Sequence, residues 1–198
     1  PIFCPLAYSG SLTLSPERFA KIKEVLNRRQ PDLTVITDNV HKSRNLSAIV
    51  RTCDAVGIPQ VHSADPDDGF GTYHGTAKGS HRWVNVSIYE GVEKPISLLQ
   101  KRGFRVYAAT LSERAVDYRT LDYTQPSAIL LGAEKWGVSE TAVDMADEHI
   151  IVPMMGMVES YNVSVAGAIV LAEAQRQRDL AGMYNESRMD PELYEKTL

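Results

Sequence analysis

Apolar residues recur at helical spacing in several separate segments of the chain. In residues 45–57, four apolar side chains lie at i, i+3, i+4 and i+7 counted from Leu46, so they share one helix face. Asn45 is well placed to cap this helix, and Gly57 lies where a glycine often follows a helix end. Helices are predicted over residues 16–29, 45–57, 92–102 and 139–146, and from residue 163 onward.

Short runs with strand-like patterns lie between these helical segments. Residues 128–132 (AILLG) form a continuous apolar run, which is typical of a strand buried on both faces. Residues 65–82 are rich in glycine and acidic side chains, and we expect a loop with a short helix there. Because strands alternate with helices, the pattern predicts an α/β fold with a mostly parallel sheet flanked by helices. The other strands are predicted over residues 33–37, 60–64, 83–89, 104–110 and 149–154.

Length and composition fit this fold. The 198 residues, 43% hydrophobic and 23% charged, suit a single globular domain over residues 1–198. We expect a basic helix at about residues 16–29 and a helical extension over about residues 180–198. The two cysteines make no disulfide framework, and the five histidines lack metal-ligand spacing, so no metal is expected. Without a signal peptide or a bilayer-spanning apolar run, the chain is expected to be cytoplasmic, with no membrane partner.

Charge is distributed unevenly along the chain. The net charge is −4, which by itself argues against a general nucleic-acid coat. Residues 18–51, however, carry eight basic and three acidic side chains, so this segment is +5 and the remainder is −9. The asymmetry indicates either a local phosphate-binding surface or a solvated helix face.

The common nucleotide-binding and hydrolase fingerprints are absent from the sequence. There is no GxGxxG between a strand and a helix, no GxxxxGK[ST] and no GxSxG. An α/β protein without these motifs needs another way to bind a ligand.

Three segments combine polar residues with predicted strand or helix ends. In residues 45–51, Arg51 projects from the polar helix face, either to bind a phosphate or ribose or as an ordinary surface arginine. In residues 130–139, Glu134 lies between glycines after a buried strand, as in a ligand site or a plain tight turn. In residues 151–168, a loop rich in Met and Gly precedes polar residues that either contact a ligand or only cap the helix.

Taken together, these segments resemble the three motifs of the SPOUT superfamily of S-adenosylmethionine-dependent RNA methyltransferases. The similarity is strongest to the TrmH branch, which methylates the ribose 2′-hydroxyl of guanosine-18 in tRNA. The motifs read NVHKSRNLSAIVRTCDAVGI, ILLGAEKWGVS and IIVPMMGMVESYNVSVAGAIVLAEAQRQR, and the resemblance covers roughly residues 17–184. It implies a SPOUT-type fold with a C-terminal deep trefoil knot, S-adenosylmethionine as methyl donor, tRNA rather than DNA as partner, and a homodimer.

The resemblance also assigns roles to individual residues. Arg51 matches the catalytic arginine, and Asn45 matches the asparagine that supports it. Glu134 matches the glutamate of the second motif, and Ser160 and Asn162 match the polar pair of the third. The main-chain groups expected to line the cofactor pocket belong to Ala109, Gly132, Val152, Met154 and Tyr161.

Two of these positions depart from the family pattern. Tyr161 stands where a smaller aliphatic residue is usual, and Ala109 where a polar residue is expected. The larger Tyr161 is expected to change the pocket wall, although a main-chain contact at this position would survive it. Because neither departure touches the motif side chains, the resemblance implies an active enzyme.

The implied reaction is methyl transfer from a sulfonium to a ribose 2′-hydroxyl. This hydroxyl is a weak nucleophile that needs proton removal or close orientation. The family proposal makes Arg51 the base. Arginine is normally protonated at physiological pH, so the alternative is that Arg51 fixes a phosphate beside the hydroxyl and that this phosphate or a water takes the proton.

The basic side chains acquire a role under this interpretation, namely contact with tRNA phosphates. Two other functions compete with it: 2′-O-methylation of ribosomal RNA or of another tRNA position, and non-catalytic RNA binding on the same fold. The expected RNA-binding residues are Arg18, Lys21, Lys23, Arg28, Arg29, Lys42, Arg44, Arg176 and Arg178.

Overall fold

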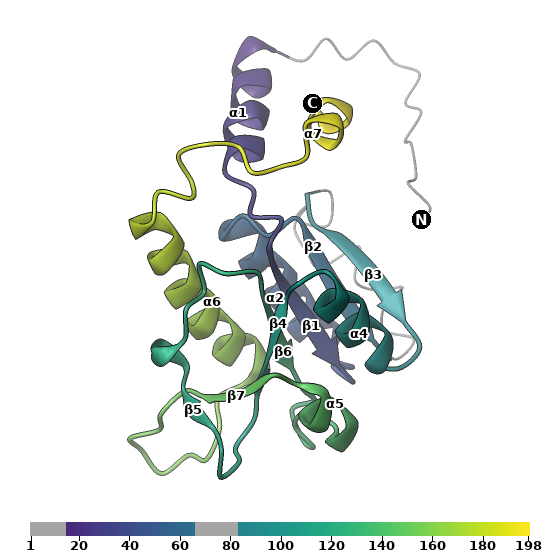
Figure 1. The fold of residues 1–198 in the computed structure, drawn as a ribbon, viewed down its shortest axis with the longest axis vertical. Helices are drawn as coiled ribbons and strands as arrows, with labels where there is room; N and C mark the ends of the chain where they lie inside the picture. The colour runs from purple at the N-terminus through teal and green to yellow at the C-terminus, as the bar shows by residue number, and fades with distance from the viewer. Residues whose placement is uncertain (1–14, 66–82) are drawn as a thin grey trace.

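The computed structural model describes residues 15–65 and 83–198, and within them seven strands form one parallel sheet. The strand order is β3-β2-β1-β6-β4-β7-β5 (Figure 1). The strands are β1 (Leu33–Asp38), β2 (Gln60–Ala64), β3 (Asn85–Tyr89), β4 (Arg105–Ala109), β5 (Val116–Asp117), β6 (Ser127–Leu131) and β7 (Glu148–Ile151).

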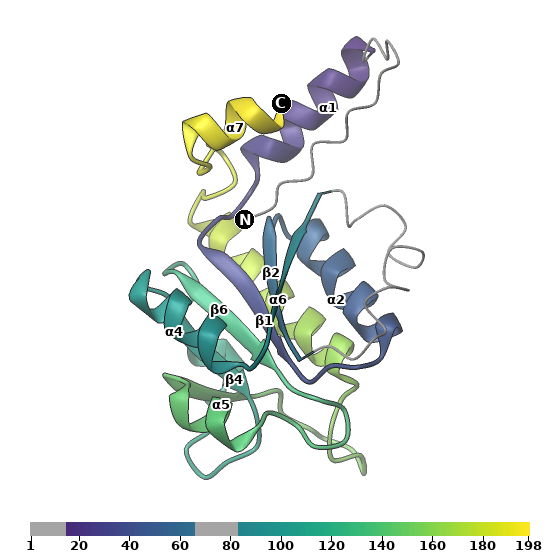
Figure 2. The same cartoon turned by 90° about the vertical axis from the view of Figure 1, so that its right-hand side faces the viewer.

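Helices cover both faces of the sheet, as Figure 2 shows. Helices α2 (Ser43–Ala55) and α6 (Val163–Leu180) pack on one face, and α4 (Glu93–Lys101) and α5 (Glu140–Met145) pack on the other. Alternate residues of the central strands point to opposite faces, so Ile129 lies in the core with α2 and α6 while Leu130 lies in the core with α4 and α5. The expected α/β fold with a flanked parallel sheet is therefore confirmed.

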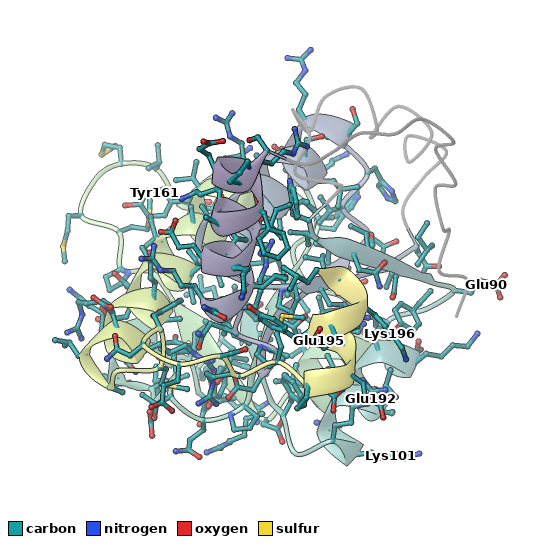
Figure 3. All side chains as sticks on the ribbon, turned by 90° about the horizontal axis from the view of Figure 1, so that it is seen from above. Glu90, Lys101, Tyr161, Glu192, Glu195 and Lys196 are labelled. Carbon is teal, nitrogen blue, oxygen red and sulfur yellow. The ribbon has the colours of Figure 1, made fainter. Side chains whose placement is uncertain are left out.

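Two helices stand apart from the sheet. Helix α1 (Pro16–Asn27) buries only Leu26 and projects beyond the amino ends of the strands (Figures 1 and 2). Helix α7 (Pro191–Thr197) lies beside it, and the Tyr194 hydroxyl donates to Asn27 Oδ1 over 2.9 Å. The first and last helices thus form one projecting unit, which Figure 3 views from above.

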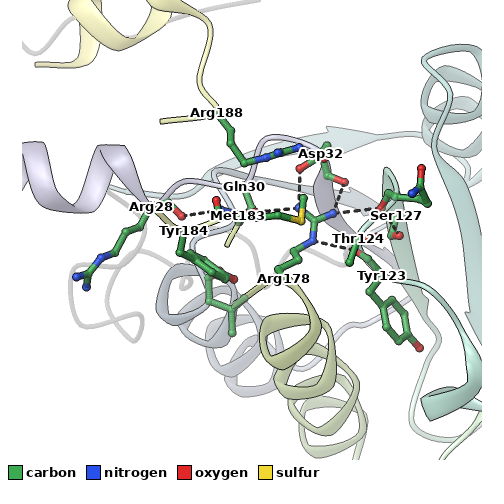
Figure 4. Close-up of polar contacts among 12 residues, drawn as sticks. Arg28, Gln30, Asp32, Tyr123, Thr124, Ser127, Arg178, Met183, Tyr184 and Arg188 are labelled. Carbon is green, nitrogen blue, oxygen red and sulfur yellow. Dashed lines mark hydrogen bonds and ion pairs between the residues drawn. The ribbon is translucent and has the colours of Figure 1, made fainter. Parts of the chain in front are cut away.

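A buried arginine joins the end of α6 to the start of β1 (Figure 4). Arg178 is fully buried, and its Nη1 lies 2.6 Å from Asp32 Oδ1 and 3.0 Å from Gln30 Oε1. Its Nε and Nη2 donate to three main-chain carbonyl groups, including those of Tyr123 and Gln125. On the outer side, Arg188 Nη2 donates to Asp32 Oδ2 over 2.6 Å.

Most element positions agree with the sequence patterns, and the differences have local causes. Helix α2 begins at Ser43 with Lys42 as its N-cap, so the expectation that Asn45 caps this helix is wrong. Strand β5 and the short 3₁₀ helix Tyr118–Thr120 were not predicted, because two or three residues show no periodicity. The loop and short helix expected over residues 65–82 lie, apart from residue 65, outside the described residues.

Candidate active site

Three neighbouring strands end at the same edge of the sheet, next to the point where the strand order reverses direction. Strands β6, β4 and β7 are adjacent and parallel, with Ala108 opposite Leu130 and Ala109 opposite Ile150. Their carboxyl ends therefore bring together the main chain at Ala109, Gly132 and Val152. In open parallel sheets, ligands bind outside this edge at such a reversal.

The loop after β6 is a tight hairpin. Two main-chain hydrogen bonds of 2.8 Å join Ala133 and Gly137. A Cβ atom on Gly132 would lie 2.1 Å from the Gly137 carbonyl carbon, and Gly137 has a φ of 69°. Only glycine fits this close approach, so the turn holds the three residues at its tip, Glu134 among them, in a fixed position.

Substituting alanine for Gly132 tests this hairpin. The added methyl group has no room against backbone atoms, so Gly132→Ala is expected to lower the free energy of unfolding by about 1–3 kcal/mol. Chemical denaturation measures this loss. Gly156→Ala is the matched control, because nothing lies within 4 Å of a Cβ atom there. Equal stability of the two variants would contradict the hairpin geometry.

Side chains from all three sequence motifs meet at Glu134. Its carboxylate accepts a hydrogen bond from Lys42 Nζ at Oε2 and one from Asn45 Nδ2 at Oε1. Asn162 Nδ2 also donates to Oε1, over 3.0 Å, and lies 3.3 Å from Asn45 Oδ1. We call these four residues the Glu134 cluster. Asn45 lies 89 residues before Glu134 in the sequence and Asn162 lies 28 residues after it, yet both donate to its carboxylate.

Each member of the Glu134 cluster is placed by a helix start or the hairpin. Asn45 lies in the first turn of α2, three residues after the N-cap Lys42, and is buried, 8% exposed. Asn162 is the N-cap of α6, where its Oδ1 accepts from the Ser164 main-chain nitrogen over 2.9 Å. One asparagine therefore both caps α6 and ties it to Glu134.

The charge of Glu134 follows from its partners. The Lys42 ammonium, with the Asn45 and Asn162 amides, holds the pKa of this carboxyl below its usual range. Because the pKa is lowered, the pairing is present above the ordinary carboxyl range and is lost only as the pH falls through the lowered pKa. At neutral pH Glu134 is therefore an acceptor that organises the cluster.

The other two candidate catalytic residues, Arg51 and Ser160, are not among the hydrogen-bonded residues of the Glu134 cluster. Arg51 is exposed on α2, six residues after Asn45, which is about 9 Å along the helix axis. Ser160 is exposed in the segment between β7 and α6. The structure thus joins Asn45, Glu134 and Asn162, and leaves Arg51 and Ser160 open to a ligand or partner.

Two of the expected RNA-binding residues are corrected by the structure. Arg29 is 2% exposed, and its guanidinium donates to Asp54 Oδ1 over 2.9 Å and to the Ile58 and Trp83 carbonyls. Arg178 is fully buried in the contacts described above. A buried guanidinium with internal acceptors cannot reach a phosphate, so neither residue is part of an RNA surface.

The remaining basic candidates are exposed. Lys42 belongs to the Glu134 cluster, and Arg176 pairs with Glu173 over 2.7 Å at the surface. The others are Arg18, Lys21, Lys23, Arg28 and Arg44.

Exposed apolar side chains gather in the loops at this edge of the sheet. Met155 and Met157 are 93% and 100% exposed, and Leu111 in the loop after β4 is 85% exposed. Val158, Tyr161 and Trp136 are exposed as well. Apolar surface concentrated at one place marks a binding or interface region.

Sequence reasoning missed one residue that supports the site. Asp38, buried at the carboxyl end of β1, accepts from the Ser139 main-chain nitrogen over 2.8 Å and so holds the far end of the loop that carries Glu134. Its position at the end of a buried strand was the available signal. Within residues 15–65 and 83–198, no three His, Cys, Asp or Glu side chains group in a way that could hold a metal ion. No helix in these ranges is long and apolar enough to cross a membrane.

Comparison with known proteins identifies relatives of this chain. Residues 32–172 match the SpoU rRNA methylase family. The chain is 55% identical over 181 residues to a tRNA (guanosine(18)-2′-O)-methyltransferase of Thermus thermophilus, covering 91% of this chain and 93% of that protein.

Solved structures show the same likeness. The chain resembles a TrmH/SpoU tRNA modifying enzyme of A. aeolicus with a TM-score of 0.84 and 41% identity, over 91% of this chain and 92% of that one. It also resembles an AdoMet-bound rRNA methyltransferase of Sinorhizobium meliloti, with a TM-score of 0.68 and 29% identity, over 77% of this chain and 59% of that one.

Proposed function

The chain belongs to the SpoU rRNA methylase family, and from this premise we propose that it transfers a methyl group from S-adenosylmethionine to the ribose 2′-hydroxyl of guanosine-18 in tRNA. The observation that carries the proposal is the Glu134 cluster. It joins side chains from three motifs at the ligand-binding edge of the sheet, in a chain closely similar to a guanosine-18 methyltransferase over nearly its whole length.

The residues at this edge fit S-adenosylmethionine. Ala109, Val152 and Met154 near the strand ends are half-buried, so part of their surface is accessible to an adenosyl ligand. Leu111 and Met155 offer exposed apolar surface in the same loops. When bound, this cofactor supplies an electrophilic methyl group on a sulfonium. The main chain that holds it is assigned to Ala109, Gly132, Val152, Met154 and Tyr161. The knotted C-terminal topology typical of SPOUT enzymes is part of the same proposal.

The protein's own task is to orient and activate a weak nucleophile. Glu134 is fixed by the Asn45 and Asn162 amides, which gives the ribose a rigid polar wall. The exposed Arg51 guanidinium is permanently charged and clamps the phosphate next to the target ribose, so that this phosphate or a water accepts the hydroxyl proton. Ser160 contacts the same nucleotide from the segment before α6.

Exposed apolar residues at the site support a homodimer. Met155, Met157 and Val158 lie in one segment, and a second copy of the chain would cover them. We propose that the dimer acts on tRNA in the cytoplasm. Sedimentation at micromolar concentration is expected to give twice the mass of the 21.9 kDa chain.

Labelled methyl transfer tests the proposed function. The protein is expected to methylate a tRNA transcript with guanosine at position 18 and not one with another base there. Methylation of ribosomal RNA fragments, or of the altered transcript, would instead support ribosomal RNA or another tRNA position as the substrate. S-adenosylmethionine is also expected to raise the melting temperature, which a non-catalytic RNA-binding module would not show.

Salt dependence tests the basic surface of α1. Lys21 and Lys23 are exposed there together with Arg18, and we expect them to contact tRNA phosphates. Replacing all three with alanine is expected to weaken tRNA binding and to reduce the slope of log affinity against log salt by about 2–3, because each phosphate contact contributes roughly 0.7–0.9. The measurement is tRNA affinity over a salt series.

A control variant uses lysines of another helix. Lys94 and Lys101 are exposed on α4, on the sheet face opposite α2. Replacing both with alanine is expected to leave the slope within about 0.5 of that of the unaltered protein. A triple α1 variant with an unchanged slope would remove α1 from the RNA surface.

A further inference from the structure

The hairpin that carries Glu134 also displays a tryptophan. Trp136 is 78% exposed, two residues after Glu134 and directly before Gly137. The two main-chain hydrogen bonds between Ala133 and Gly137 and the close contact of Gly132 with Gly137 fix the turn. The indole is therefore held at the site by a rigid loop, although little of its surface is buried by the protein itself.

An exposed indole in a fixed position suits a flat aromatic ligand. Lys135 Nζ lies 4.5 Å from the centre of the Trp136 ring, so an ammonium group covers one face. The opposite face is then the one available for stacking. Aromatic side chains beside basic groups are the usual platforms for nucleobases, because the ring stacks on the base while the cations attract the phosphates.

Distance along the chain limits what the indole reaches. Two residues of extended chain span at most about 7 Å, so the Cα atoms of Glu134 and Trp136 are no farther apart than this. A nucleotide whose ribose lies at the Glu134 cluster has its base within reach of the indole. The Lys135 ammonium adds positive charge beside the indole, whereas the Lys42 ammonium is paired with the Glu134 carboxylate.

We propose that Trp136 stacks on the nucleobase of the nucleotide that is methylated, and favours a purine there because a larger ring covers more of the indole. This role rests on the proposed function, since it requires an RNA nucleotide at the Glu134 cluster. It makes Trp136 a substrate-binding residue that helps select the target base, in addition to the polar residues of the three motifs.

Steady-state kinetics with two substitutions test the proposal. Trp136→Ala is expected to raise KM for tRNA by about 10- to 100-fold, whereas Trp136→Phe keeps a stacking ring and is expected to raise KM less than about fivefold. The KM for S-adenosylmethionine and the sedimentation mass are expected not to change. Trp83→Ala is the matched control, because Trp83 precedes β3 at the amino end of the sheet, and its KM for tRNA is expected to equal that of the unaltered protein.

A tRNA that lacks only the base at the methylated position makes the test specific. Because methylation requires guanosine at this position, the readout on this tRNA is binding affinity. Trp136→Ala and the unaltered protein are expected to bind it equally, since there is no base to stack. Equal penalties on the complete and abasic substrates, a raised KM for S-adenosylmethionine, or a change of oligomeric state would each overturn the proposal. Failure of the unaltered protein to methylate any tRNA would instead refute the proposed function.

Discussion

Replacing Arg51 with alanine is expected to lower kcat for methyl transfer by about 100-fold or more, with tRNA affinity reduced less than about tenfold. Arg51 is an exposed arginine on α2, close along the helix to Asn45. A clamp on the phosphate next to the target ribose acts mainly by orienting the hydroxyl and helping its proton leave, and such effects on rate are typically 10²–10⁴-fold. Its share of total tRNA affinity is one phosphate contact among several.

Two further variants separate the possible roles of Arg51. Arg51→Lys is expected to remain strongly impaired in kcat, because an ammonium does not reproduce the two-pronged contact of a guanidinium with phosphate. Arg44→Ala is the comparison, since Arg44 lies seven residues earlier on nearly the same face of α2 and is also exposed. It is expected to weaken tRNA affinity with little loss of kcat. Equal losses of rate and affinity in Arg51→Ala would show a plain RNA contact without a role in the chemistry.

Replacing Arg178 with alanine is expected to destabilise the fold by about 3–5 kcal/mol. The guanidinium is fully buried and donates to Gln30 Oε1, to Asp32 and to the main chain of Tyr123 and Gln125 (Figure 4). Its loss leaves a cavity and several buried acceptors without a donor. For a chain of this length, the expected fall in melting temperature is about 6–20 °C.

Arg176 provides the matched control for this substitution. It lies on the same helix two residues earlier, and its pair with Glu173 is at the surface, with the arginine side chain 58% exposed. Arg176→Ala is expected to change stability by no more than about 1 kcal/mol. Calorimetry measures the melting temperatures of both variants. Similar melting temperatures would contradict the structural role given to Arg178.

Residue type alone does not distinguish the buried Arg178 from the exposed Arg176. Both were expected to bind phosphates because they are basic and end a helix. Arg178, however, follows the buried residues Leu171 and Ala174 by seven and four positions, so it lies on the buried face of α6. The helical period therefore predicts that Arg178 is buried. It does not predict which acceptors compensate its charge, because these come from distant segments of the chain.

The same distinction applies to the site. Periodicity located the helices and strands to within a few residues, because each pattern is local. The Asn45–Glu134 and Asn162–Glu134 contacts join residues 89 and 28 positions apart, which no local pattern specifies. The resemblance to a family implied only that these residues belong to one site, without specifying the contacts between them. The local pattern therefore predicts Asn45 as a helix cap, whereas in the structure its amide donates to Glu134.

The central claim is methyl transfer to one particular hydroxyl group, and a single substrate change tests it most directly. The measurement is labelled methyl transfer from S-adenosylmethionine to two otherwise identical tRNAs, one with guanosine and one with 2′-deoxyguanosine at position 18. The account predicts about one methyl group per molecule on the first tRNA and none on the second, with similar affinity for both. Equal methylation of the two would contradict it, because the label would then be on a base or at another position.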